Sequence, residues 1–98
     1  MDKYKVLEKK ILYLKECVDN ASPSNDRTKQ YLVRYAQILN ETLLSIRDKT
    51  ISDSNGSMLG MGKGLSDWDE LCSNHELVKA AYDVDEYYRY ECVSFNDK

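Results

Sequence analysis

Apolar residues recur along this chain at spacings of three and four, and this periodicity constrains the fold more than any other feature. One face of an α-helix repeats about every 3.6 residues, so side chains at these spacings lie on one side of a helix. The first run has successive spacings of 3, 4, 3 and 4 and consists of Tyr4, Leu7, Ile11, Leu14 and Val18. We therefore expect an amphipathic helix over about residues 2–20.

Two more runs with this spacing predict two further long helices. The second run consists of Leu32, Tyr35, Leu39, Leu43 and Ile46, with Tyr31, Ile38 and Leu44 widening its apolar stripe. The third run consists of Leu77, Ala81, Val84, Tyr88, Cys92 and Phe95. Pro23 disfavours a helical conformation at the residue before it, while Ser24 or Asn25, and later Asn74, can cap a helix start. These patterns predict helices over about residues 25–50 and 75–94.

The segment between the second and third long helices is rich in Ser, Asn and Gly, which predicts a loop over about residues 52–65. Ser66 followed by Asp69 and Glu70 has the pattern of a helix start, so a short helix is expected over about residues 67–73. We find no sustained alternation of apolar and polar residues that would predict a strand. Residues 1–98 are therefore expected to form a single all-α domain: a small antiparallel bundle of three main helices plus one short helix, with a Gly-rich loop.

The Gly-rich stretch GMGKG superficially resembles a phosphate-binding loop but lacks the residues that such a loop needs. A P-loop has glycine five residues before the last glycine of the motif and Ser or Thr after the lysine. Here Ser57 and Gly64 stand at those positions. Two readings remain open for the apolar side chains in the stretch, among them Met61 and Leu65: a connector packed on the bundle, or an exposed tip that binds a partner.

Charge is distributed unevenly between the two halves of the chain. Residues 1–50 contain 10 Lys/Arg and 7 Asp/Glu, whereas residues 51–98 contain 4 Lys/Arg and 10 Asp/Glu. An acidic surface repels a phosphate backbone, so direct binding to nucleic acid is not expected, and a protein partner with a basic surface is favoured.

Cysteine content and hydropathy bear on the compartment. The chain has three cysteines at spacings that match no disulfide framework, which favours reduced thiols in the cytoplasm. No apolar run approaches the roughly 18 residues that span a bilayer, and the first residues are charged, so neither membrane insertion nor export is expected.

Acids and tyrosines gather on the predicted last helix, on the side away from its apolar stripe. They are Asp83, Glu86, Tyr87 and Tyr90. Tyrosine is enriched at protein interfaces and acids select a cationic partner, so we predict that these side chains form the centre of a partner-binding surface. A solvated helix face is the alternative.

A second candidate patch precedes the last helix and has the same acidic, aromatic character. It consists of Asp67, Trp68, Asp69 and Glu70. Trp68 has an alternative role as an anchor of the short helix in the core, and the acids also suit a helix start.

No constellation of residues predicts catalysis, a metal or a cofactor. Cys72 and His75 form a Cys-x-x-His pair, but Cys17 and Cys92 come singly from distant segments, whereas structural zinc sites bring ligands in closely spaced pairs. The expected roles are packing for Cys72 and Cys92, and exposure for His75. We expect a protein that is not an enzyme.

The stretch from Leu59-Gly60-Met61-Gly62 to Leu65-Ser66-Asp67, after a helix ending in Ile46-Arg47, resembles a pattern found in small bacterial helical proteins. In those proteins a helix leads through a loop containing G-G-M-G-S and a nearby N-D into further helices, and some resemble immunity proteins that neutralise a toxin. Here Leu59, Lys63 and Ser66 replace the first glycine, the serine and the asparagine. The resemblance implies an all-α fold and a binding role.

Two functions follow as hypotheses. The first is a cytoplasmic inhibitor or immunity-type factor that covers a basic site on another protein. The second is a self-associating helical adaptor, so the chain is expected to be a monomer or a homodimer. The spacing of the apolar stripes fits packing within one bundle or between two copies.

Overall fold

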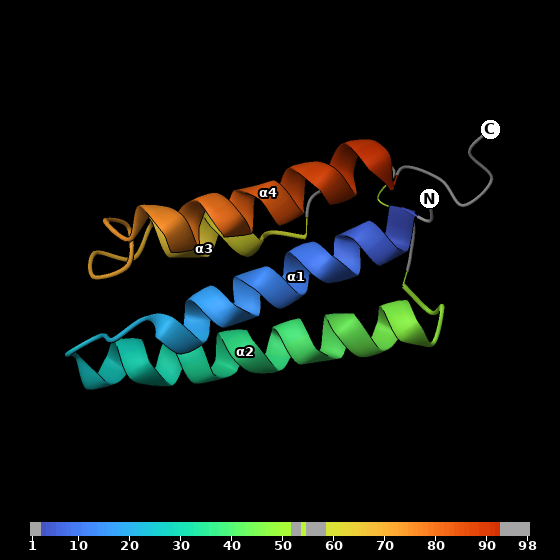
Figure 1. Ribbon diagram of the computed structural model, residues 1–98. Coiled ribbons are helices and arrows are strands. Elements are labelled where there is room, and N and C mark those ends of the chain that lie inside the picture. The colour runs from blue at the N-terminus through green and yellow to red at the C-terminus, as the bar shows by residue number, and fades with distance from the viewer. Residues whose placement is uncertain (1–2, 52–53, 55–58, 93–98) are drawn as a thin grey trace.

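A computed structural model describes residues 3–51, 54 and 59–92 and shows an all-helical chain (Figure 1). The four helices are α1 (Lys3–Asn20), α2 (Asp26–Arg47), α3 (Met61–Ser66) and α4 (His75–Glu91). No strand occurs in the described part of the chain. The prediction of an all-α fold is confirmed.

Helix α1 lies between α2 and α4 and runs antiparallel to both (Figure 1). The short helix α3 packs along α4. Side chains of α2 reach α3 as well, because the Tyr35 hydroxyl donates a hydrogen bond to the carbonyl of Met61 at 2.8 Å. The segment that contains α3 therefore completes the bundle on the side where α2 and α4 do not contact each other.

The apolar stripes predicted from the sequence form the core. The described members of the three runs are buried, from Tyr4 in α1 to Cys92 after α4, and Phe95 lies outside the described residues. Ile38 and Leu44 were expected to widen the stripe of α2, but 49% and 56% of their surfaces are exposed. Helix α2 packs against one neighbouring long helix, so its buried stripe is narrower than its sequence suggests.

Caps define the starts of the two later long helices. The Asn25 side chain accepts a hydrogen bond from the Arg27 amide at the start of α2, and the Asn74 side chain accepts one from the Leu77 amide at the start of α4. These bonds satisfy amides that have no partner within the helix. At its other end α2 stops at Arg47 rather than near residue 50, because Lys49 has a left-handed conformation with φ of 59°. The predicted extension of α4 to residue 94 lies outside the described residues.

The helix between α2 and α4 lies earlier in the sequence than predicted. Residues 61–66 form α3, where a loop over 52–65 was expected, and residues 67–73 form turns, where a short helix was expected. Ser66 ends α3 instead of capping a helix start. Gly60 precedes α3 in the left-handed conformation with φ of 83°, which glycine adopts at little cost.

The start of α3 is capped by a side chain from α4. Asp85 is 1% exposed, and its carboxylate accepts hydrogen bonds from the amides of Met61 at 2.8 Å and Gly62 at 2.7 Å. Asp85 is 24 positions from Met61 and 23 from Gly62 in the chain, so no local sequence pattern predicts this contact. It explains why a Gly-rich stretch without a cap of its own forms a helix.

The Gly-rich stretch contributes side chains to the core. Met61 and Leu65 are buried, and Leu59 is half-buried against the same cluster. Met61 and Leu65 therefore belong to the hydrophobic core. No helix in the described ranges is both long and apolar enough to cross a membrane.

Candidate functional site

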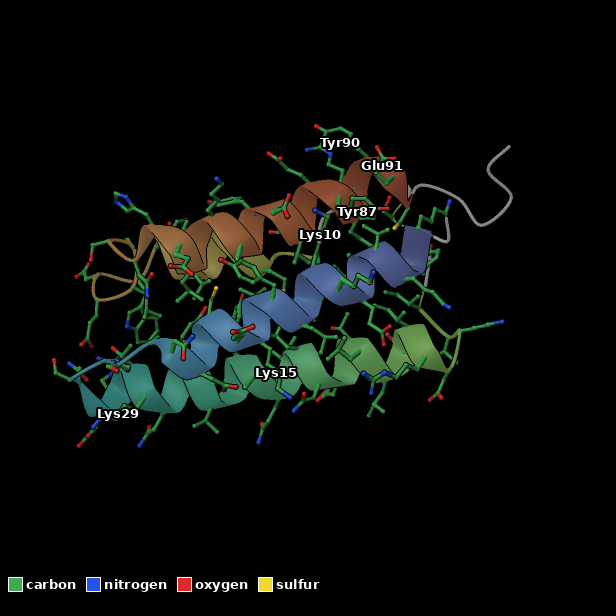
Figure 2. The ribbon with its side chains drawn as sticks, in the orientation of Figure 1. Lys10, Lys15, Lys29, Tyr87, Tyr90 and Glu91 are labelled. Carbon is green, nitrogen blue, oxygen red and sulfur yellow. The ribbon has the colours of Figure 1, made fainter. Side chains whose placement is uncertain are left out.

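The predicted acidic and aromatic surface on α4 divides into two parts in the structure. Asp83, Glu86 and Tyr90 are exposed, whereas Tyr87 is half-buried and packs against the core. Figure 2 shows Tyr90 and Glu91 pointing outward and Tyr87 lying on the side of Lys10. The four side chains therefore do not form one uniform face.

Lys10 of α1 neutralises part of the predicted surface. Its Nζ lies 2.9 Å from an Asp83 carboxylate oxygen and 5.3 Å from the centroid of the Tyr87 ring. Both contacts cross from α1 to α4. A cation over a tyrosine ring and a carboxylate beside it form a small local network, which leaves Asp83 and Tyr87 less available to a partner.

The remaining part of the surface retains its negative charge. Glu86 and Glu91 are exposed and form no ion pair or hydrogen bond with any residue that the structure describes. Tyr90 between them is 63% exposed, and the Arg89 guanidinium lies 5.2 Å from its ring centroid. We call Glu86, Tyr90 and Glu91 the α4 face. Glu91 was not among the predicted site residues, although it directly follows Tyr90.

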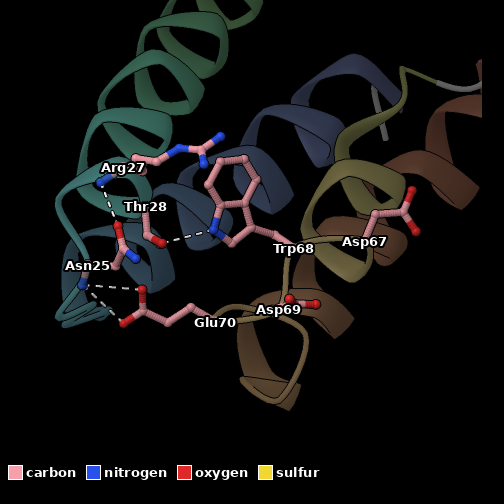
Figure 3. Close-up of a pocket in the computed structure, with 7 residues that line it drawn as sticks. All are labelled: Asn25, Arg27, Thr28, Asp67, Trp68, Asp69 and Glu70. Atoms are coloured by element: carbon pink, nitrogen blue, oxygen red, sulfur yellow. Dashed lines mark hydrogen bonds between the residues drawn. The ribbon is translucent and has the colours of Figure 1, made fainter.

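In the second predicted patch, Trp68 has a structural role. Its indole Nε1 donates a hydrogen bond to the Thr28 hydroxyl at 2.8 Å, and its ring stacks on Tyr31 with centroids 4.4 Å apart. Figure 3 shows the indole directed at Thr28 near the start of α2. Trp68 thus fixes the turn after α3 to α2, in agreement with the alternative role of an anchor.

Glu70 is the second link between this turn and α2. Its carboxylate accepts hydrogen bonds from the Ser24 amide at 2.6 Å, the Ser24 hydroxyl at 3.0 Å and the Asn25 amide at 3.3 Å (Figure 3 shows the link to Asn25). Hydrogen bonds from Thr28 and then from Ser24 and Asn25 lower the pKa of Glu70 from its usual 4.5. The carboxylate serves the start of α2 rather than a partner.

Replacing Glu70 with Gln should lower the free energy of unfolding at neutral pH, because a neutral amide oxygen accepts more weakly from Ser24 and Asn25. Folding lowers the pKa of Glu70 below 4.5, so its contribution is fully present above that pH and is lost as the pH falls through the lowered pKa. Urea unfolding of both proteins should show a difference in stability that shrinks as the pH falls below 4.5. A difference that persists unchanged into strong acid would contradict this role.

Asp67 and Asp69 are the two members of the second patch that remain exposed. They border a shallow hollow of about 320 Å³, which Trp68, Glu70, Asn25, Arg27 and Thr28 also line (Figure 3). No three His, Cys, Asp or Glu side chains in the described residues are grouped as metal ligands would be. This hollow therefore places the two exposed carboxylates beside Trp68, which anchors the turn to α2.

Asp85 is a buried carboxylate that was not among the predicted site residues, and it contacts the Gly-rich stretch. Because it accepts from the amides of Met61 and Gly62, these amides already have an anionic partner within the chain. A phosphate group would have to displace a buried carboxylate to use them. The only sequence signal was an acid located on the apolar side of α4, between Ala81 and Tyr88.

The cysteines and the histidine form no catalytic arrangement in the described residues. Cys17 and Cys92 are buried, Cys72 is exposed rather than packed as expected, and the three cysteines form no disulfide with one another. Burial raises the pKa of the Cys17 thiol, which disfavours the reactive thiolate. His75 is exposed at the first position of α4, as predicted.

Comparisons of the chain with models of protein families, with characterised proteins and with solved structures found no match.

Proposed function

We propose that this protein is a non-enzymatic binding module whose α4 face takes up a basic surface of a partner protein. In this role it acts as an inhibitor or immunity-type factor that masks a cationic site. The observation that carries the proposal is the exposure of Tyr90, 63% of whose surface is accessible, between two carboxylates without partners among the described residues.

The chemistry of the α4 face favours a protein partner. A tyrosine supplies a large, rigid contact area, and aromatic residues are enriched among the side chains that dominate binding energy. Glu86 and Glu91 add a negative potential that accelerates encounter with a cationic surface and disfavours acidic competitors. Three cysteines that form no disulfide fit a reducing compartment, so we place this activity in the cytoplasm.

Self-association is a second candidate, favoured by two apolar side chains on the outer side of α2. Val33 is 60% exposed and Leu44 is 56% exposed. Light scattering over a range of concentrations separates the two functions. If the molar mass equals that of a single chain at all concentrations, the adaptor hypothesis is wrong.

Capture of partners from a lysate of the source cells should depend on the α4 face. The immobilised wild type is compared with Glu86→Lys/Tyr90→Ala, in which one charge is reversed and one large side chain is removed. Glu16→Lys/Leu12→Ala reverses a charge in the same direction and truncates an exposed apolar side chain on α1, and it serves as the matched control. We avoid Tyr87 because its ring packs against the core.

The expected result is a basic protein that the wild type and the control retain and the α4 variant loses. Circular dichroism of all three proteins checks that each is folded. If the folded α4 variant captures the same proteins in the same amounts as the wild type, the assignment of the binding surface is wrong.

A further inference from the structure

A second hollow lies between α2 and the start of α3, away from the α4 face. Its volume is about 330 Å³, and its apolar lining consists of Tyr31, Tyr35, Ile38, Leu59, Gly60 and Met61. Binding pockets in proteins begin at about this size. Ile38 and the two tyrosines were assigned to the apolar stripe of α2, and the other three residues belong to the Gly-rich stretch.

Polar contacts hold two of the residues that line this hollow. The Tyr35 hydroxyl donates to the Met61 carbonyl at 2.8 Å, and the Met61 amide donates to Asp85. At one end the Tyr31 ring stacks on Trp68. Since these groups are fixed before any partner arrives, binding here requires little ordering of the protein.

Arg34 supplies a positive charge at the edge of the hollow. It is exposed, and no hydrogen bond, ion pair or ring contact links it to another residue in the described part of the chain. Nearby, 49% of the Ile38 surface is accessible. An unpaired guanidinium beside an exposed apolar side chain is complementary to a carboxylate beside an apolar group.

We propose that this hollow docks a segment of a partner protein that presents a large apolar side chain next to an acidic one. The apolar side chain covers Ile38 and the tyrosines, and the carboxylate pairs with Arg34. The site has the opposite charge preference from the α4 face, and it is independent of the function proposed for that face. The whole chain has a net charge of −3, so the attraction for an acidic segment comes from the local positive charge of Arg34.

The fluorescence of Trp68 gives a direct test of binding. Trp68 is the only tryptophan in the sequence, and its ring stacks on Tyr31, which lines the hollow. The probes are two capped peptides, acetyl-Ser-Phe-Glu-Leu-Ser-amide and the same peptide with Lys in place of Glu. Neither contains Trp or Tyr, so the fluorescence reports the protein. We expect a saturable change with the Glu peptide and a dissociation constant about fivefold higher for the Lys peptide.

Two substitutions on α2 separate the charge from the apolar contact. Arg34→Glu should reverse the preference, so that the Lys peptide binds more tightly than the Glu peptide. Ile38→Ser should weaken both peptides by about tenfold, because apolar area is no longer covered. Val33→Ser removes an apolar side chain that is still more exposed on the same helix, and it should change neither affinity.

Several results would overturn the proposal. They are the absence of a saturable signal with either peptide up to about 10 mM, equal affinity for the two peptides, and an unchanged preference in Arg34→Glu. Binding of free phenylacetate as tightly as the Glu peptide would indicate a small-molecule site instead. Dimerisation of the protein that Arg34→Glu abolishes would indicate that a second copy occupies the hollow.

Discussion

Replacing Asp85 with Ala should lower the free energy of unfolding by about 3 kcal/mol. The substitution removes a buried carboxylate and leaves the amides of Met61 and Gly62 without their acceptor. Buried donors that lose their partner cost more than the average hydrogen bond contributes, and bonds to charged acceptors are the stronger ones. Urea unfolding followed by circular dichroism measures the effect.

Asp83→Ala is the matched control for this prediction. It removes the same side chain from the same helix, but Asp83 is exposed and its ion pair with Lys10 lies at the surface. Such pairs contribute at most about 1 kcal/mol. If Asp85→Ala and Asp83→Ala cost equally little, the carboxylate does not hold α3 in place.

Leu65→Ala should lower the free energy of unfolding by about 2–5 kcal/mol, the range for deletion of a fully buried leucine side chain. Leu65 is completely buried, although it lies in the stretch for which a loop was predicted. The loss combines the missing apolar contacts with the cavity that remains between α3 and its neighbours. Thermal or urea unfolding detects a change of this size.

Leu44→Ala provides the comparison, because Leu44 is 56% exposed on α2. Truncation of an exposed side chain of this kind changes stability by less than about 0.5 kcal/mol. A similar small loss in Leu65→Ala would mean that the Gly-rich segment does not form part of the core in solution.

The long helices could be predicted from the sequence because their signals are local. Residues three and four apart report directly on a helix face, so the described members of the three predicted runs are buried. Ile38 and Leu44, which were expected to widen the second run, are exposed. Asn25 and Asn74 marked helix starts through bonds to amides two and three residues away. The fold class needed no information beyond these short spacings.

The position of α3 could not be predicted, because its cap comes from Asp85 on another helix. The turns at 67–73 likewise depend on bonds from Trp68 and Glu70 to the start of α2, which is 40 or more residues away in the chain. By local propensity alone, Ser66 and the acids after it predict the start of a helix. The contacts between distant segments place these residues after the helix.

The same limit applies to the candidate site. The sequence correctly separated outward-facing acids from the apolar stripe of α4. The sequence did not predict that Lys10 lies against Asp83 and Tyr87, because Lys10 and Asp83 are 73 residues apart in the chain. The structure therefore moves the proposed centre of binding toward the end of α4, to Glu86, Tyr90 and Glu91.

The most direct test of the proposed function is the affinity of the captured partner for Tyr90→Ala, measured by titration calorimetry beside the wild type and the Glu16→Lys/Leu12→Ala control. We predict a loss of about 2 kcal/mol, or roughly 30-fold in Kd, for Tyr90→Ala. The control should bind as the wild type does. Equal affinities for wild type and a folded Tyr90→Ala variant would contradict a binding surface on α4.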